Sequence, residues 1–116
     1  MLKGQVPIIN GDGEQTRDYI YVKDIVQANL LALNLDGSDT FNVGTGQETS
    51  VNELTHLILK VAQSDIEVQT SKKNNFEQRR ICLDYKKLKG SLNWSPKVSL
   101  KEGLSETFIF FKNNGI

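Results

Sequence analysis

The segment from residue 22 to residue 35 constrains this chain most, because its pattern predicts a helix with apolar side chains around most of its circumference. Two apolar stripes run along it, one of Val22, Ile25 and Val26 and one of Ala28, Leu31, Ala32 and Leu35, with Leu30 and Leu33 between them. A surface helix of a small domain needs only one such stripe. We therefore expect burial on two sides, and in a chain of 116 residues one of these sides is expected to face something outside the chain.

The charge balance excludes one class of partner and leaves one question open. The 14 Lys and Arg residues balance 14 Asp and Glu residues, so wholesale electrostatic binding to nucleic acid or to an acidic membrane is not expected. The balance hides an asymmetry, since residues 1–60 carry eight acidic and four basic side chains, and residues 61–116 carry six acidic and ten basic ones. Either the two halves attract each other, or the second half has a small basic site for an anionic ligand.

Cysteine usage and hydropathy favour a cytoplasmic protein. Cys82 is the only cysteine, so an internal disulfide is excluded and a reducing compartment is the default. Because Cys82 lies in an apolar triplet with no His beside it, we predict a buried, unreactive thiol. No apolar run approaches the roughly 20 residues of a membrane-spanning helix, so no membrane partner is expected.

Strands and helices alternate along the chain, which predicts an α/β or α+β fold of one small domain. Ser50 with Glu53, and Ser99 with Glu102, have the spacing of capping boxes and predict two helix starts. His56 falls beside the apolar stripe of the first of these helices and is expected at the surface, without a metal. The remaining elements are expected as strands at 6–9, 16–22, 40–43, 66–69 and 81–83, a brief helix through residue 88, and an apolar anchor at 92–96.

Two patterns resemble dehydrogenase motifs, and both have simpler explanations. Gly44 and Gly46 lie between a predicted strand and a predicted helix, but the third glycine of a dinucleotide fingerprint is missing, so a turn is expected. Tyr19 and Lys23 have Y-x-x-x-K spacing, yet they straddle a strand-to-helix junction and need not share a helical face. Neither pattern is expected to be catalytic.

Arg17 is the candidate with the clearest chemistry. It lies in a β-favouring stretch just after a glycine-rich turn. A planar guanidinium suits a bidentate contact with phosphate. A salt bridge to Asp18 or Asp24 is the alternative, and the residue types alone favour neither.

Residues 11–24, GDGEQTRDYIYVKD, are similar to the G-D-G-x-Q-x-R-D-[YF]-I-x-V-x-D motif of the NAD-dependent nucleotide-sugar epimerases and dehydratases. These enzymes are the extended short-chain dehydrogenase/reductases, typified by UDP-glucose 4-epimerase. The similarity continues in order through residues 41–46, 50–54, 77–80, 84, 92–96 and 99–104.

The resemblance covers only the second part of such an enzyme. It implies that residues 1–116 are a C-terminal nucleotide-sugar-binding domain, with the N-terminal Rossmann domain absent and residues 22–46 packing on it. The family's G-x-x-G-x-x-G motif and catalytic Tyr-x-x-x-Lys are missing from this sequence. The resemblance therefore implies that NAD is used by the full-length enzyme, and that this chain has no catalytic residue, binds no NAD and is inactive alone.

The resemblance also implies a ligand and its contacts. The ligand is a UDP- or dTDP-sugar, whose diphosphate Arg17 would grip with Tyr19 beside it. Val51 would line the nucleoside pocket, and Glu77 would accept hydrogen bonds from ribose hydroxyls. Many relatives read R-P-G-E where this chain reads N-N-F-E, so Lys73 would replace the second phosphate-binding arginine as a point charge.

Two questions stay open beside this interpretation. Arg79 and Arg80 match a common R-R pair of the family, but they could equally pair with acidic residues of the first half. The alternative function is a stand-alone, non-catalytic binding or oligomerisation module that reuses the fold. In that case the helix at 22–35 would cover the interface of a homodimer.

Overall fold

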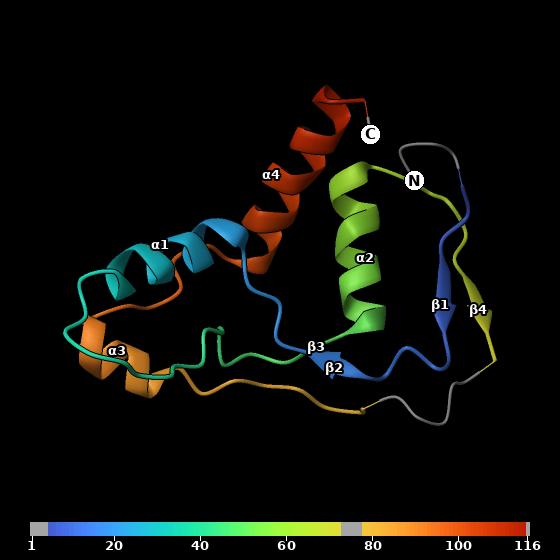
Figure 1. Ribbon diagram of the computed structural model, residues 1–116. Helices are drawn as coiled ribbons and strands as arrows, with labels where there is room; N and C mark the ends of the chain where they lie inside the picture. Colours follow the sequence, from blue (N-terminus) through green and yellow to red (C-terminus); the bar gives the residue numbers. More distant parts are fainter. Residues whose placement is uncertain (1–4, 73–77, 116) are drawn as a thin grey trace.

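Four helices and four short strands occur in the residues that the computed structural model describes, 5–72 and 78–115, which confirms the expected α/β class. In chain order they are β1 (Ile8–Asn10), β2 (Thr16–Arg17), α1 (Val22–Ala32), β3 (Thr49–Ser50), α2 (Val51–Ala62), β4 (Gln69–Ser71), α3 (Lys86–Leu92) and α4 (Leu100–Asn113). Figure 1 shows β2 and β3 beneath α2, β1 and β4 side by side at one end, and α3 at the other.

The strands form two separate pairs. β1 runs parallel to β4, and β2 runs antiparallel to β3 with Arg17 opposite Thr49. Thr16 also forms a parallel bridge with Arg80. The strands expected at 40–43 and 81–83 are not present. Residues 81–83 form no strand because pairing beside β2 ends at the Thr16–Arg80 bridge. Residues 40–43 form none because they have no strand neighbour among the described residues. A strand needs such a neighbour for its backbone hydrogen bonds.

Both predicted capping boxes are confirmed. The Ser50 hydroxyl accepts from the Glu53 amide at 3.1 Å, and the Glu53 carboxylate accepts from the Ser50 amide at 2.8 Å. Ser99 and Glu102 make the same exchange at the start of α4. The two helices that these boxes begin pack against each other, as Figure 1 shows.

The core is small and lies between α1 and α3. Its fully buried members are Ala28, Leu88 and Trp94, and the last of these confirms the predicted apolar anchor. The Trp94 indole donates to the Asp24 carbonyl at 3.1 Å. The Asp24 carboxylate in turn accepts from the Lys97 amide at 3.1 Å, so the start of α1 fixes the segment that leads into α4.

One face of α1 is open. Val22, Val26, Leu30 and Leu33 are between 47% and 80% exposed, whereas Ala28 on the opposite face is 3% exposed. Within the described residues, nothing covers this apolar stripe, in agreement with the expectation that one side of the helix faces something outside the chain.

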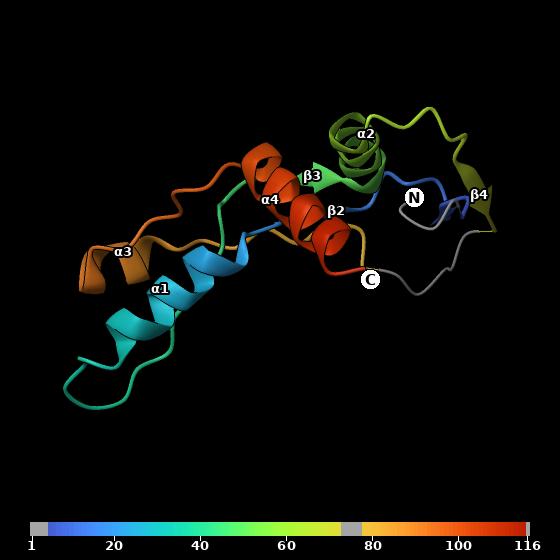
Figure 2. The same ribbon diagram turned by 90° about the horizontal axis from the view of Figure 1, so that it is seen from above.

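The shape of the molecule agrees with an uncovered face. Its extents are 50 × 37 × 18 Å, and its radius of gyration is 16.7 Å, against about 13 Å for a compact domain of this length. Figure 2 shows α1 and α3 standing apart from α2 and the β1–β4 pair. The accessible surface is 8408 Å², against roughly 6,300 Å² for a folded monomer of this mass. In the described part of the chain, no helix is long and apolar enough to cross a membrane.

Candidate functional site

Arg17 is fixed by backbone carbonyls from two segments. Its Nη1 donates to the Thr16 carbonyl and to the Gln78 carbonyl, both at 2.8 Å. The side chain is half-buried, in the β2–β3 ladder. Neither of the acidic residues considered from the sequence forms a salt bridge with it, because Asp18 and Asp24 accept from other groups of the described chain.

Asp18, the next residue, binds the turn that contains the two glycines. Its carboxylate accepts from the Thr45 amide at 2.8 Å, the Thr45 hydroxyl at 2.6 Å and the Gly46 amide at 2.9 Å. The Leu83 amide adds a fourth hydrogen bond at 3.2 Å. A Cβ at Gly44 would lie 2.7 Å from the Asp18 carboxylate, so the close approach requires glycine. These contacts confirm that the glycines form a turn.

The same contacts set the acidity of Asp18. Burial raises the pKa of this carboxyl, but the hydrogen bonds from Thr45, Gly46 and Leu83 lower it by more, and the net pKa lies below its ordinary value. Asp18 is therefore ionised at neutral pH and acts as an acceptor only.

Val51 lies two residues beyond Thr49, the residue opposite Arg17 in the β2–β3 ladder. It is the first residue of α2, directly after β3, and its amide donates to the Gln15 carbonyl at 3.1 Å. Two of the sequence-predicted site residues, Arg17 and Val51, thus belong to or directly follow the β2–β3 ladder. Two others, Lys73 and Glu77, lie outside the described residues.

Tyr19 lines a neighbouring cleft of about 350 Å³, which neither Arg17 nor Val51 lines. The rest of the lining comes from Thr45, Gln47, Thr49, Tyr85 and residues 96–100. No sequence motif selects Gln47, Tyr85 or Lys97, because they come from separate segments that only the fold brings together.

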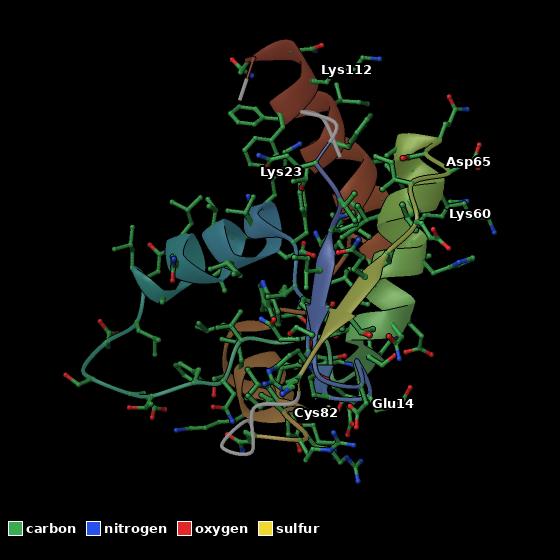
Figure 3. All side chains as sticks on the ribbon, turned by 90° about the vertical axis from the view of Figure 1, so that its right-hand side faces the viewer. Glu14, Lys23, Lys60, Asp65, Cys82 and Lys112 are labelled. Carbon is green, nitrogen blue, oxygen red and sulfur yellow. The ribbon has the colours of Figure 1, made fainter. Side chains whose placement is uncertain are left out.

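Lys23, the second member of the Y-x-x-x-K pattern, binds to α4. The Lys23 ammonium binds the Glu106 carboxylate of α4 at 2.5 Å, and the Tyr21 hydroxyl donates to the same carboxylate at 2.8 Å. Figure 3 shows Lys23 at the start of α1, close to α4. The hydrogen bonds and charge of Lys23 lower the pKa of Glu106, so this contact is an ion pair that joins two helices.

Ion pairs join the acidic first half of the chain, residues 1–60, to the basic second half, residues 61–116, as one of the two explanations of the charge asymmetry predicts. Arg79 binds the Asp12 carboxylate at 2.9 Å, and Arg80 binds Glu48 through two nitrogens at 3.0 and 2.7 Å. Lys87 and Asp39 form a third pair. Arg79 and Arg80 therefore pair with acidic residues of the first half.

Two further expectations concern Cys82 and His56. The prediction of a buried thiol is wrong, because Cys82 is exposed on a loop that runs along the surface (Figure 3). The strand expected at 81–83 does not form, and these residues lie outside both strand pairs of the described chain. His56 is exposed on α2, as predicted, and no cluster of metal-binding side chains occurs in the described residues.

Comparisons with known proteins give the family. The family model described as GDP-mannose 4,6 dehydratase matches residues 1–107. A protein of Methanocaldococcus jannaschii, provisionally named UDP-glucose 4-epimerase, is 48% identical over 114 residues, which are 98% of this chain and 37% of that protein.

Solved structures agree. The UDP-glucose 4-epimerase of Thermotoga maritima, crystallised with UDP-glucose, superposes with a TM-score of 0.94 at 43% identity, over 100% of this chain and 38% of that one. The UDP-glucose 4-epimerase of Thermus thermophilus, in complex with NAD, gives a TM-score of 0.86 at 31% identity, over 96% of this chain and 37% of that one. This chain thus spans little more than a third of the length of these relatives. It belongs to the GDP-mannose 4,6 dehydratase family of NAD-dependent nucleotide-sugar epimerases and dehydratases, and corresponds to the C-terminal part of its members.

Proposed function

We propose that this chain supplies the nucleotide-sugar-binding part of an NAD-dependent epimerase that resembles UDP-glucose 4-epimerase. The observation that carries the proposal is the fixed guanidinium of Arg17, held by the Thr16 and Gln78 carbonyls beside the start of α2. The similarity to an epimerase crystallised with UDP-glucose supports it.

In this proposal the binding residues act at a distance from the reacting carbon. Arg17 binds the diphosphate with Tyr19 beside it, and Val51 lines the nucleoside pocket. Lys73 and Glu77, outside the described residues, would add a charge near the phosphates and an acceptor for the ribose hydroxyls. Binding energy from these remote groups is used to orient the sugar, which lowers the barrier of the chemical step.

The proposal assigns the open face of α1 to a second domain. Residues 22–46 would pack against a nucleotide-binding domain that holds NAD and supplies the catalytic groups. The exposed stripe of Val22, Val26, Leu30 and Leu33 and the flat shape of the molecule support this assignment. Alone, the chain would be inactive and would bind no NAD. A cytoplasmic location is consistent with the free thiol of Cys82.

Isothermal titration of the 116-residue chain tests this function. UDP, dTDP and NAD⁺ are titrated separately, with adenosine monophosphate as a control nucleotide. We expect heat of binding for UDP or dTDP and none for NAD⁺ or the control. Tight binding of NAD⁺, with no response to either pyrimidine nucleotide, would refute the proposal.

A further inference from the structure

The cleft beside Tyr19 contains polar groups that the fold does not use. Its volume of about 350 Å³ falls within the range of small-molecule sites, about 300–1,000 Å³. Five of its side chains make no hydrogen bond or ion pair with any part of the described chain, namely those of Tyr19, Gln47, Thr49, Tyr85 and Lys97. Two other lining hydroxyls are occupied, since Thr45 donates to Asp18 and Ser99 donates to Glu102.

The chemistry of these groups points to one class of ligand. Each tyrosine hydroxyl, the threonine hydroxyl and the Gln47 amide can donate as well as accept hydrogen bonds. The hydroxyls of a sugar have the same property. The tyrosine rings, with Pro96 and Val98, add apolar surface that suits the C–H face of a sugar ring. Lys97 is the one charged lining residue that the structure describes, so the cleft lacks the paired cations that a diphosphate favours.

The walls of the cleft are held in place from behind. The Tyr85 ring meets the ring of Trp94 edge to face, with centroids 5.7 Å apart, and Trp94 is 3% exposed. Asp18 fixes the Thr45–Gly46 turn, and Asp24 fixes the amide of Lys97. Such preorganisation reduces the entropy that a ligand must lose on binding.

We propose that this cleft is a second ligand site, which binds a neutral saccharide. It lies next to the proposed nucleotide site, because Thr49 is the residue opposite Arg17 in the β2–β3 ladder, but Arg17 and Val51 do not line it. Tyr19 is the one residue common to both proposals, so the test leaves Tyr19 unchanged. The saccharide site does not rest on the proposed function.

Chemical-shift mapping of the ¹⁵N-labelled chain tests the saccharide site. Methyl β-D-glucopyranoside is added at millimolar concentrations, and UDP is titrated into a parallel sample. We expect shifts of the Gln47, Thr49 and Tyr85 amides with the glucoside, and no displacement of the glucoside by UDP. Absent shifts, or displacement by UDP, would overturn a separate site.

Variants separate the site from adventitious binding. Gln47→Ala combined with Tyr85→Phe removes two of the hydrogen-bonding groups that the fold does not use, so the affinity for the glucoside should fall by about 30-fold. Gln27→Ala, at an exposed position of α1, is the matched control and should bind as the wild type does. Gln47→Ala alone is measured as well, in case the double variant is unfolded. Equal affinity in the control and the cleft variants would contradict the proposal.

The two proposals fail separately. A chain that binds the glucoside but not UDP or dTDP keeps the saccharide site and loses the proposed function. A chain that binds UDP but not the glucoside keeps the proposed function and loses the saccharide site.

Discussion

Arg17 and Asp18 are adjacent, yet they bind to different parts of the molecule. Asp18 accepts from the Thr45–Gly46 turn and from the Leu83 amide, and Arg17 donates to the Gln78 carbonyl, near the start of the segment that contains Leu83. Asp18 directly follows Arg17, the last residue of β2, so hydrogen bonds that hold Asp18 also restrain the backbone of Arg17. The structural contacts of Asp18 therefore help to place the guanidinium that we assign to the diphosphate.

Removal of the guanidinium should weaken nucleotide binding without loss of the fold. Hydrogen bonds to a charged group are worth about 1.5–3 kcal/mol, so Arg17→Ala should raise the dissociation constant for UDP by about 10- to 100-fold. Arg17→Lys should recover only part of this loss, since an ammonium lacks the planar fork. Isothermal titration measures both. Arg79→Ala, which removes an exposed ion pair with Asp12, is the matched control, and a loss as large as that of Arg17→Ala would contradict the assignment.

Asp18 should contribute stability that depends on pH. Its pKa in the folded protein lies below its ordinary value, so the ionised form stabilises the fold above that ordinary value, and the stabilisation is lost as the pH falls through the folded-state pKa. Asp18→Ala leaves amides of the turn without their acceptor and should cost about 1–3 kcal/mol at neutral pH.

Urea unfolding at neutral and acidic pH measures this effect. The difference between the wild type and Asp18→Ala should shrink at acidic pH, whereas the exposed Asp36→Asn should change little at either pH. A difference that stays constant with pH would show that the charge of Asp18 is not responsible.

Among the elements, those with local signals were predicted and those that depend on distant partners were not. The capping boxes at Ser50 and Ser99 exchange hydrogen bonds within three residues, so the sequence alone defines where α2 and α4 begin. The segment at 81–83 is apolar, but whether it pairs depends on β2, far away in the chain, and there the ladder ends at Arg80. The candidate site residues differ in the same respect. Arg17 and Val51 belong to recognisable motifs and were predicted, whereas Tyr85 and Lys97 belong to none and were not.

Two helical glycines should respond in opposite ways to the same substitution. A Cβ added at Gly90 in α3 would have no neighbouring atom within 4 Å, so Gly90→Ala should stabilise the chain by roughly 0.5–1 kcal/mol through helix propensity. At Gly103 in α4 a Cβ would meet the Cδ2 and Cβ atoms of Tyr21 at 3.0 and 3.2 Å. Gly103→Ala should therefore destabilise the chain, since overpacking costs about 1–3 kcal/mol. Thermal unfolding compares the two, and stabilisation by both would contradict close packing of α4 on Tyr21.

For the whole molecule, the accessible surface exceeds that expected for its mass by about 2,000 Å², which is more than twice the roughly 800 Å² that one partner buries in a standard protein–protein interface. The two apolar stripes at 22–35 predicted from the sequence that one side of this helix has no partner within the chain. Which partner covers the outer stripe could not be predicted, because an apolar face has no directional chemistry.

A charge on the open face of α1 should leave the fold intact. Leu30 is 50% exposed, so Leu30→Glu should change the free energy of unfolding by less than about 0.5 kcal/mol and should reduce self-association. Size-exclusion chromatography with light scattering measures the second effect. Ala28→Glu, at a position that is 3% exposed, should unfold the chain and serves as the contrasting control. A discrete wild-type dimer that Leu30→Glu dissociates would instead favour the stand-alone module.

The assignment of Arg17 to the diphosphate is best tested by locating the binding site of UDP-glucose on the chain. Chemical-shift mapping of the ¹⁵N-labelled chain measures this position. We expect UDP-glucose to shift the amides of residues 15–17, 50–51 and 78–81, and we expect Arg17→Ala to abolish these shifts. Shifts confined to the far end of α2 around Lys60, or shifts that Arg17→Ala leaves unchanged, would contradict the assignment of Arg17 to the diphosphate.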